Sequence, residues 1–268
     1  MTLRFTILGC GSSPGVPRPN GDWGACDPSN PKNARLRASL LVERTSGGAT
    51  TRVVIDTGPD FRAQCVRNGI SSLDGVVYTH AHADHIHGID DVRTFVLVSR
   101  RRMPIWANDR TFARLNEAFG YCFQTPHGSG YPPICDRQRI ASERFDIDGP
   151  GGVIGFMPIE QEHGADRSLG FRIGDVAYCS DVSAFPDGSR DALAGLDVLI
   201  IDALQYRTHP SHLSLGQAID VIRELAPKRA ILTHMHTPLD YDTLVRELPD
   251  HIEPGYDGLT FEADDVVP

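Results

Sequence analysis

Residues 79–88 read Thr-His-Ala-His-Ala-Asp-His-Ile-His-Gly, and this stretch is the most informative part of the sequence. Four side chains that can bind a metal ion stand within six residues, separated by small alanines: His80, His82, Asp84 and His85. Imidazole and carboxylate groups suit zinc, manganese or iron. Because one ion cannot easily use all four side chains, the spacing predicts a site for two ions.

Further candidate ligands follow apolar segments elsewhere in the chain. The short apolar segment 75–78 is predicted to be a strand that leads into the histidine cluster, and a helix is expected to follow it. His163, Asp181 and His234 each come at or after the end of another predicted strand. Together they supply the bridging carboxylate and the outer ligands that a centre with two metal ions needs.

The apolar patterning of the whole chain predicts an α/β fold. Strands are expected over 3–8, 38–43, 52–56, 75–78, 105–107, 153–158, 169–173, 176–180, 198–202 and 230–232, and helices over 60–68, 109–119, 214–225 and 241–248. The strands come in runs, with helices interspersed and no strict βαβ repeat. This order favours layered sheets flanked by helices over one doubly wound sheet. We expect a single domain over residues 1–268.

Residues 120–150 differ from their surroundings. They are rich in glycine, proline and aromatic residues, and their apolar periodicity is weak. We interpret this segment as a long loop or lid-like insert over the site, although a surface excursion without function fits it equally well.

Composition and charge narrow the function. The formal net charge of -9 repels nucleic acid phosphates, and two divalent ions would create one electropositive spot, so a small anionic substrate is favoured over a polynucleotide. No apolar run approaches the roughly 18 residues that span a membrane. The N-terminus lacks the features of a signal peptide, and the six cysteines are scattered without a CxxC pair. We therefore expect a cytoplasmic protein with free thiols and no membrane contact.

The ordered ligand pattern resembles the metallo-β-lactamase-fold hydrolases. It comprises His-x-His-x-Asp-His at 80–85, then His163, Asp181 and His234, with Asp56-Thr57-Gly58 upstream. The resemblance implies an αββα four-layer sandwich with the metals at one edge. By position it assigns His80, His82 and His163 to one ion, Asp84, His85 and His234 to the other, and Asp181 to both. Two ions of zinc or manganese, with iron also suited, would share a water whose hydroxide is the nucleophile.

The N-terminal loop narrows the resemblance to one branch. Residues 8–17, 23–26 and 232–236 are similar to the phosphoribosyl cyclic phosphodiesterases. This similarity implies a hydrolase of a small phosphodiester, such as a cyclic ribose phosphate or a nucleotide-like compound, with Asp84 and His212 as catalytic residues. His212 would donate a proton to the leaving group, and His209 is the competing candidate. Ser12 and Ser13 are predicted to contact phosphate, although turn formation explains them equally well.

The same branch carries an additional zinc on a cysteine cluster near the N-terminus. This chain retains only Cys26 and His236 there as evident ligands, so we predict no structural zinc.

Two alternative functions remain open. A tRNA 3′-processing nuclease would need a basic arm, whereas the arginines of the 120–150 insert are balanced by acids. A non-catalytic accessory protein of pyrroloquinoline quinone biosynthesis shares the fold and a similar N-terminal loop, but the full ligand set and His212 favour catalysis. The resemblance also makes a homodimer plausible.

Overall fold

Two seven-stranded mixed sheets form the centre of the computed structural model, which describes residues 2–264. The first sheet has the order β14-β1-β2-β3-β4-β5-β6. Its strands are β1 (Thr2–Gly9), β2 (Ser39–Ser46), β3 (Ala49–Ile55), β4 (Gly75–Val77), β5 (Met103–Ala107), β6 (Cys135–Arg139) and β14 (Thr260–Asp264). Strands β14, β1, β2 and β3 pair antiparallel, and β3, β4, β5 and β6 pair parallel.

The second sheet has the order β13-β12-β11-β10-β9-β8-β7. Its strands are β7 (Phe145–Ile147), β8 (Ile154–His163), β9 (Asp166–Ile173), β10 (Val176–Cys179), β11 (Val198–Asp202), β12 (Arg229–Thr233) and β13 (Ile252–Pro254). Strands β10 to β13 pair parallel, and β7 to β10 pair antiparallel. Each sheet therefore has a parallel half in which all the strand carboxyl ends lie at the same edge.

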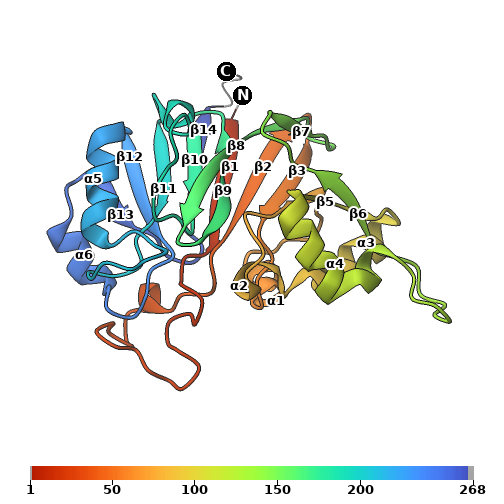
Figure 1. The fold of residues 1–268 in the computed structure, drawn as a ribbon, viewed down its shortest axis with the longest axis horizontal. Helices are drawn as coiled ribbons and strands as arrows, with labels where there is room; N and C mark the ends of the chain where they lie inside the picture. Colours follow the sequence, from red (N-terminus) through yellow and green to blue (C-terminus); the bar gives the residue numbers. More distant parts are fainter. Residues whose placement is uncertain (1, 265–268) are drawn as a thin grey trace.

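Helices cover the outer faces of both sheets (Figure 1). The first sheet is covered by α1 (Phe61–Arg67), α2 (Ala83–Ile86), α3 (Arg93–Ser99) and α4 (Asp109–Phe123), and the second by α5 (Leu215–Leu225) and α6 (Tyr241–Glu247). Short 3-10 helices lie at Pro31–Asn33, Ile89–Val92 and Asp191–Leu193. The predicted αββα four-layer sandwich is confirmed. Within residues 2–264, no helix is long and apolar enough to cross a membrane.

Alternating side chains of the first sheet divide between two apolar layers. On β3, Val53 and Ile55 face the cluster shared with the second sheet, whereas Val54 faces the cluster under α1 to α4. On β4, Val77 faces the cluster shared with the second sheet, and Val76 faces the cluster under α1 to α4. A strand buried on both faces reads as a continuous apolar run, which is why these segments could be predicted as strands.

The segment 120–150 contains more regular structure than the expected long loop. Helix α4 continues through Phe123, β6 forms the edge of the first sheet beside β5, and β7 pairs with β8 at the edge of the second. Residues between α4 and β6 extend away from the sheets at the far right of Figure 1. The segment thus contributes to two sheet edges, and its role as a lid over the site stays a prediction. Its periodicity is weak because β6 buries only Cys135 and exposes the rest of its side chains.

Candidate metal centre and active site

The candidate ligands lie at the edge where the parallel strands of both sheets end. His80 follows β4, Asp181 follows β10, His234 follows β12, and His163 is the last residue of β8. The fold brings the carboxyl ends of these strands together, although their positions in the chain span residues 80–234. Ligand sites in α/β proteins characteristically occupy this end of the strands.

Three residues at these strand ends have left-handed backbone conformations. Asp56 has a φ of 64°, Asp181 a φ of 55° and His234 a φ of 55°. Non-glycine residues seldom adopt this region, and they tend to do so at functional sites where the surrounding structure holds them. The turn at the end of each strand is thereby fixed, and with it the direction in which the side chain leaves the sheet.

Within the described part of the chain, four overlapping groups of side chains are each able to hold an ion: two of them include His212, and two consist of predicted ligands alone. Of the latter two, His80, His82 and His163 make one group, and Asp84, His85, Asp181 and His234 make the other. In each group the potential ligand atoms lie within 4.8 Å of one another. Nδ1 of His82 and Nε2 of His163 face each other at 3.3 Å. The structure therefore gathers all seven predicted ligands, and their division between two ions stays a prediction.

Asp181 lies at the centre of the assembly. Its carboxylate oxygens face Nε2 atoms of five histidines at distances of 3.1–4.0 Å: His80, His85, His163, His212 and His234. Oδ2 of Asp181 also accepts a hydrogen bond of 2.6 Å from the hydroxyl of Ser180. A carboxylate placed between two ligand groups in this way has the position expected of a bridging ligand.

Partners outside the ligand groups orient the imidazoles. Nδ1 of His85 lies 2.7 Å from Asp56 Oδ2, and Nδ1 of His163 lies 2.7 Å from the carbonyl oxygen of Ser211. Nδ1 of His80 lies 3.0 Å from the hydroxyl of Thr79. With Nδ1 occupied, Nε2 of each ring is left to face the centre, which is the arrangement of metal-binding histidines.

The donor set fits divalent ions. Nε2 atoms of His80, His85 and His234 are buried and form no hydrogen bond with any residue that the structure describes. Buried polar atoms without partners are costly, and a coordinated metal ion satisfies them. Nitrogen and carboxylate donors in these numbers suit zinc, manganese or iron alike.

Electrostatic coupling within the site is strong. Burial lowers the pKa of His80 well below its ordinary value. Burial opposes the charged form of His234 too, but nearby carboxylates, chiefly Asp181, more than offset it and raise its pKa to about 9. Burial likewise opposes the charge of Asp181, yet His234 and His85 hold the pKa of that carboxyl well below its usual range. Carboxylates that stabilise the protonated form of neighbouring imidazoles would also stabilise a bound divalent cation.

His212 occupies the position expected of a proton donor. Its Nδ1 lies 2.6 Å from Oδ2 of Asp202, the last residue of β11. Its Nε2 faces the metal-ligand groups, 4.0 Å from Asp181 Oδ1. The competing candidate, His209, is exposed, and its ring centroid lies 5.3 Å from that of His212. Of these two described histidines, only His212 is held by a carboxylate, which fixes the orientation of its ring.

The two serines of the N-terminal loop have protein partners. Ser13 donates a hydrogen bond of 2.6 Å to Asp84 Oδ2, and Ser12 Oγ lies 2.8 Å from Nδ1 of His236. Both hydroxyls contact protein side chains in this structure, so phosphate binding by Ser12 and Ser13 stays a prediction. The contact with Asp84 gives Ser13 a different task, which is to orient a candidate metal ligand.

Cys26 and His236 lie around a buried arginine. Nη1 of Arg35 is 3.8 Å from Cys26 Sγ and 3.4 Å from the carbonyl oxygen of His236. The second ring nitrogen of His236 accepts a bond of 2.6 Å from Arg18. The guanidinium of Arg35 thus connects the N-terminal loop with the loop after β12.

Sequence reasoning named Asp56 only as part of the family pattern, and it assigned an orienting role to none of the partners of the imidazoles. Asp56 and Asp202 are fully buried, and each follows or ends an apolar strand, as the recognised ligands do. An acidic residue at the carboxyl end of a predicted strand was the available signal. The carbonyl of Ser211 left no such signal, because any residue supplies a backbone oxygen.

The fold and the site together define the class of protein. Residues 51–235 match the family described as the beta-lactamase superfamily domain, and the chain belongs to that family. Its two sheets and outer helices are those of the metallo-β-lactamase sandwich.

More particular similarities cover nearly the whole chain. A solved structure described as a new diphosphatase from the PhnP family is 37% identical, with a TM-score of 0.87 and 98% of each chain covered. The octanoyltransferase of Porphyromonas gingivalis (strain ATCC BAA-308 / W83) is 33% identical over 260 residues, which are 96% of this chain and 51% of that protein. The chain thus spans about half the length of this curated relative. Zn(2+)-bound PqqB from Methylobacterium extorquens shares the fold at 17% identity, with a TM-score of 0.72 and coverage of 96% and 99%.

Proposed function

We propose that this protein is a hydrolase of small phosphodiesters that works with two divalent metal ions. The observation that carries the proposal is the placement of His212, held by Asp202 and directed at the two ligand groups. A site that only stored or carried metal would not need an oriented histidine beside the ligands. The similarity to a structure described as a PhnP-family diphosphatase supports phosphoryl chemistry.

The residues divide the work. Bound divalent ions would supply an activated water and positive charge for the phosphoryl oxygens. His80, His82 and His163 would hold one ion and Asp84, His85 and His234 the other, with Asp181 shared. Asp202 accepts a hydrogen bond from Nδ1 of His212, so Nε2 is free to give its proton to the departing alkoxide oxygen.

The charge distribution favours a small substrate. Arg137 and Arg139 of the 120–150 segment both pair with Asp109, and Arg144 pairs with Asp146. These pairs leave no basic arm for gripping tRNA there, which counts against the nuclease alternative. The substrate we propose is a cyclic ribose phosphate, a nucleotide-like diester or another small phosphodiester. The accessory-protein alternative predicts no turnover at all.

The first test is hydrolysis of bis-p-nitrophenyl phosphate by the protein loaded with Zn²⁺ or Mn²⁺. We expect turnover that chelation abolishes. His212→Asn retains an amide donor toward Asp202 but cannot transfer a proton, so its rate should fall ~10²–10⁴-fold while the metal content stays unchanged.

His251→Ala serves as the matched control, because His251 is an exposed histidine outside the site. Two bound ions without any turnover would refute the proposed phosphodiesterase activity. An unchanged rate in His212→Asn would show that His209 or water, and not His212, donates the proton.

A further inference from the structure

The ligand groups are accessible from one side. The side chain of His82 is 48% exposed, whereas those of His80, His163 and Asp181 are at most 4% exposed. The remaining ligands are also buried, with Asp84 the most accessible of them at 10%. A substrate that reaches the site must therefore pass His82, and the groups around His82 form the mouth.

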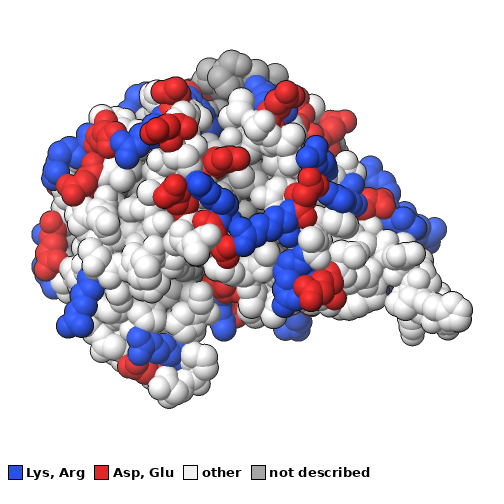
Figure 2. Space-filling view, viewed as in Figure 1, with Lys and Arg blue, Asp and Glu red and all other residues white. Residues whose placement is uncertain are grey.

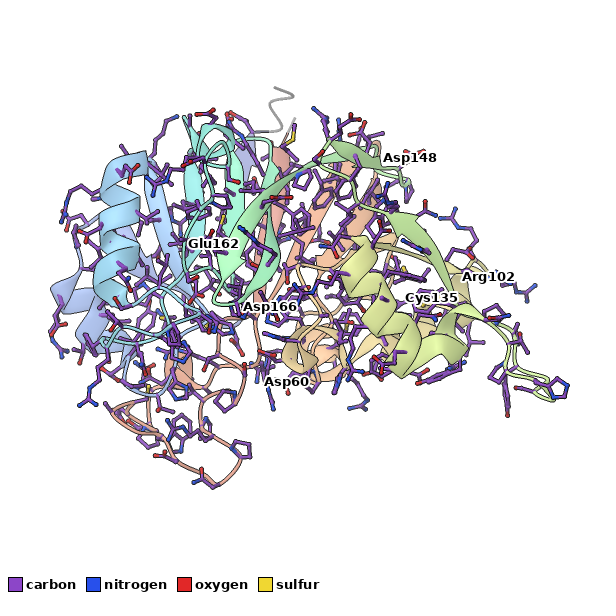
Figure 3. The ribbon with its side chains drawn as sticks, in the orientation of Figure 1. Asp60, Arg102, Cys135, Asp148, Glu162 and Asp166 are labelled. Carbon is purple, nitrogen blue, oxygen red and sulfur yellow. The ribbon has the colours of Figure 1, made fainter. Side chains whose placement is uncertain are left out.

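An ion pair lies beside His82 at this mouth. Asp166, the first residue of β9, has its Oδ2 3.8 Å from Nε2 of His82, and its Oδ1 binds Arg110 of the first turn of α4. Figure 3 places Asp166 at the lower tip of the hairpin formed by β8 and β9. Figure 2 shows acidic and basic side chains alternating across the middle of this face, over the hairpin and the start of α4. One carboxylate thus separates the guanidinium of Arg110 from an exposed candidate ligand.

This ion pair is easily exchanged. The side chains of Arg110 and Asp166 are 62% and 40% exposed, and exposed ion pairs contribute little to stability. The contact of Asp166 with His82 is too long for a hydrogen bond. A phosphate group resembles a carboxylate in charge and in its ability to accept two hydrogen bonds from a guanidinium.

Another arginine beside the site is less free. Arg37 contacts both oxygens of Asp60 and the carbonyl oxygen of Ser13, and its side chain is only 25% exposed. Arg37 therefore holds the N-terminal loop to α1. Arg110 lies at the open side of the site and, among residues 2–264, forms an ion pair with Asp166 alone, so it has the freedom that ligand binding requires.

We propose that Arg110 binds a second phosphate group of the substrate, taking it in place of Asp166. Within the small phosphodiesters proposed above, the favoured substrate is then one whose reacting phosphate is joined to a second phosphate, as in a nucleoside diphosphate compound. One phosphate would lie among the ligand groups, and the next would lie where Asp166 now meets Arg110. This inference rests on the proposed phosphoryl chemistry and names the substrate that it serves.

The test compares adenosine 5′-monophosphate with adenosine 5′-diphosphate as competitive inhibitors of bis-p-nitrophenyl phosphate hydrolysis. These compounds share the base and the sugar and differ by one phosphate. Wild type should bind the diphosphate more tightly. In Arg110→Gln the ratio of the two affinities should fall roughly tenfold, which corresponds to the loss of one charge-assisted hydrogen bond. Arg110→Lys should recover part of this ratio.

Arg114→Gln is the matched control. Arg114 lies on the same helix, is 49% exposed and pairs with Glu117, so it shares the chemistry of Arg110 but not its position. It should keep the wild-type preference. Asp166→Asn should bind the diphosphate more tightly than wild type, since the competing carboxylate is gone.

Three results would overturn the proposal: wild type that does not prefer the diphosphate, an unchanged preference in Arg110→Gln, or an equal loss in Arg114→Gln. Calorimetric titration of both nucleotides into the metal-loaded proteins measures the same preference without turnover. If the wild type hydrolyses nothing, the proposed function fails, but the calorimetric comparison still decides what Arg110 binds.

Discussion

Asp181 connects the two halves of the candidate site. It has a left-handed backbone, so the chain turns sharply at the end of β10 and brings the carboxylate among five imidazoles. Its carbonyl oxygen accepts a hydrogen bond of 2.7 Å from Ser168, which ties this turn to β9. Its carboxylate faces histidines of both ligand groups and His212.

Replacement of Asp181 should therefore remove more than one ligand contact. We expect Asp181→Ala to lose both tightly bound ions and nearly all hydrolysis, because the shared carboxylate is absent and five imidazoles are left facing one another. Metal content per chain, measured after dialysis by elemental analysis, checks this.

Asp197→Ala is the control, since Asp197 lies just before β11, at the end of the sheet opposite the site, and pairs with Lys228. Two ions retained by Asp181→Ala with wild-type affinity would contradict the bridging assignment.

At the scale of elements, the turn after β3 and helix α2 fit closely together. Thr57 donates a backbone hydrogen bond of 2.9 Å to His85, and Gly88 donates one of 2.8 Å to Thr57. Gly58 lies against the backbone of α2: a Cβ there would be 2.1 Å from the carbonyl oxygen of Asp84. The position of α2, with its two candidate ligands, thus depends on the small size of Gly58.

Gly58→Ala should displace α2. We expect the free energy of unfolding to fall by about 1–3 kcal/mol, as for other overpacked sites, and the affinity for metal to fall with it. Urea unfolding and metal titration measure these two effects.

Gly216→Ala, in α5, is the matched control. A Cβ at Gly216 meets nothing within 4 Å, so alanine should leave the metal affinity unchanged and leave stability unchanged or slightly raised. Equal effects of the two substitutions would show that the contact between Gly58 and Asp84 is unimportant.

The elements differ in how far the sequence predicts them. Strand β11 is apolar up to its last residue, Asp202, and was predicted with its observed bounds, Val198–Asp202. Strand β6 could not be predicted, since it reads Cys-Asp-Arg-Gln-Arg and buries one side chain. Its strand conformation comes from pairing with β5, which no local pattern records. The seven side chains that the structure gathers could be named from their order along the chain, but their orienting partners and the mouth at His82 depend on tertiary packing.

At the scale of the whole molecule, Asp257 is a buried acid that is not among the candidate ligands. Its side chain is 3% exposed, and it accepts hydrogen bonds from the backbone of Leu36 at 2.8 Å and of Cys10 at 3.2 Å. Burial raises the pKa of Asp257 to about 7, even though these donors and Arg67 favour the charged form. Asp257 thus connects the end of β1, the N-terminal loop and α1 through one titratable group.

This buried acid should make stability depend on pH. The folded state binds the Asp257 proton more tightly than the unfolded chain, so the stabilisation is fully present below about pH 4 and is lost as pH rises through 7. The difference in unfolding free energy between wild type and Asp257→Asn should therefore shrink, by up to a few kcal/mol, between about pH 4 and pH 8.

Urea titrations of both proteins at several pH values measure this difference. Asp250→Asn, at an exposed position, is the control and should run parallel to wild type. A constant difference across this range would contradict the raised pKa of Asp257.

The distribution of the ligands along the chain has a consequence for folding. Residues 80–85 contain four candidate ligands in one contiguous segment, whereas the other three candidates lie at the ends of β8, β10 and β12. An unfolded chain can offer only the contiguous segment, and the full set exists only after both sheets have packed. Contacts between such distant residues form late and slowly. Tight metal binding would therefore indicate that folding is complete. The rate at which a refolding chain binds metal would measure how fast the second sheet packs against the first.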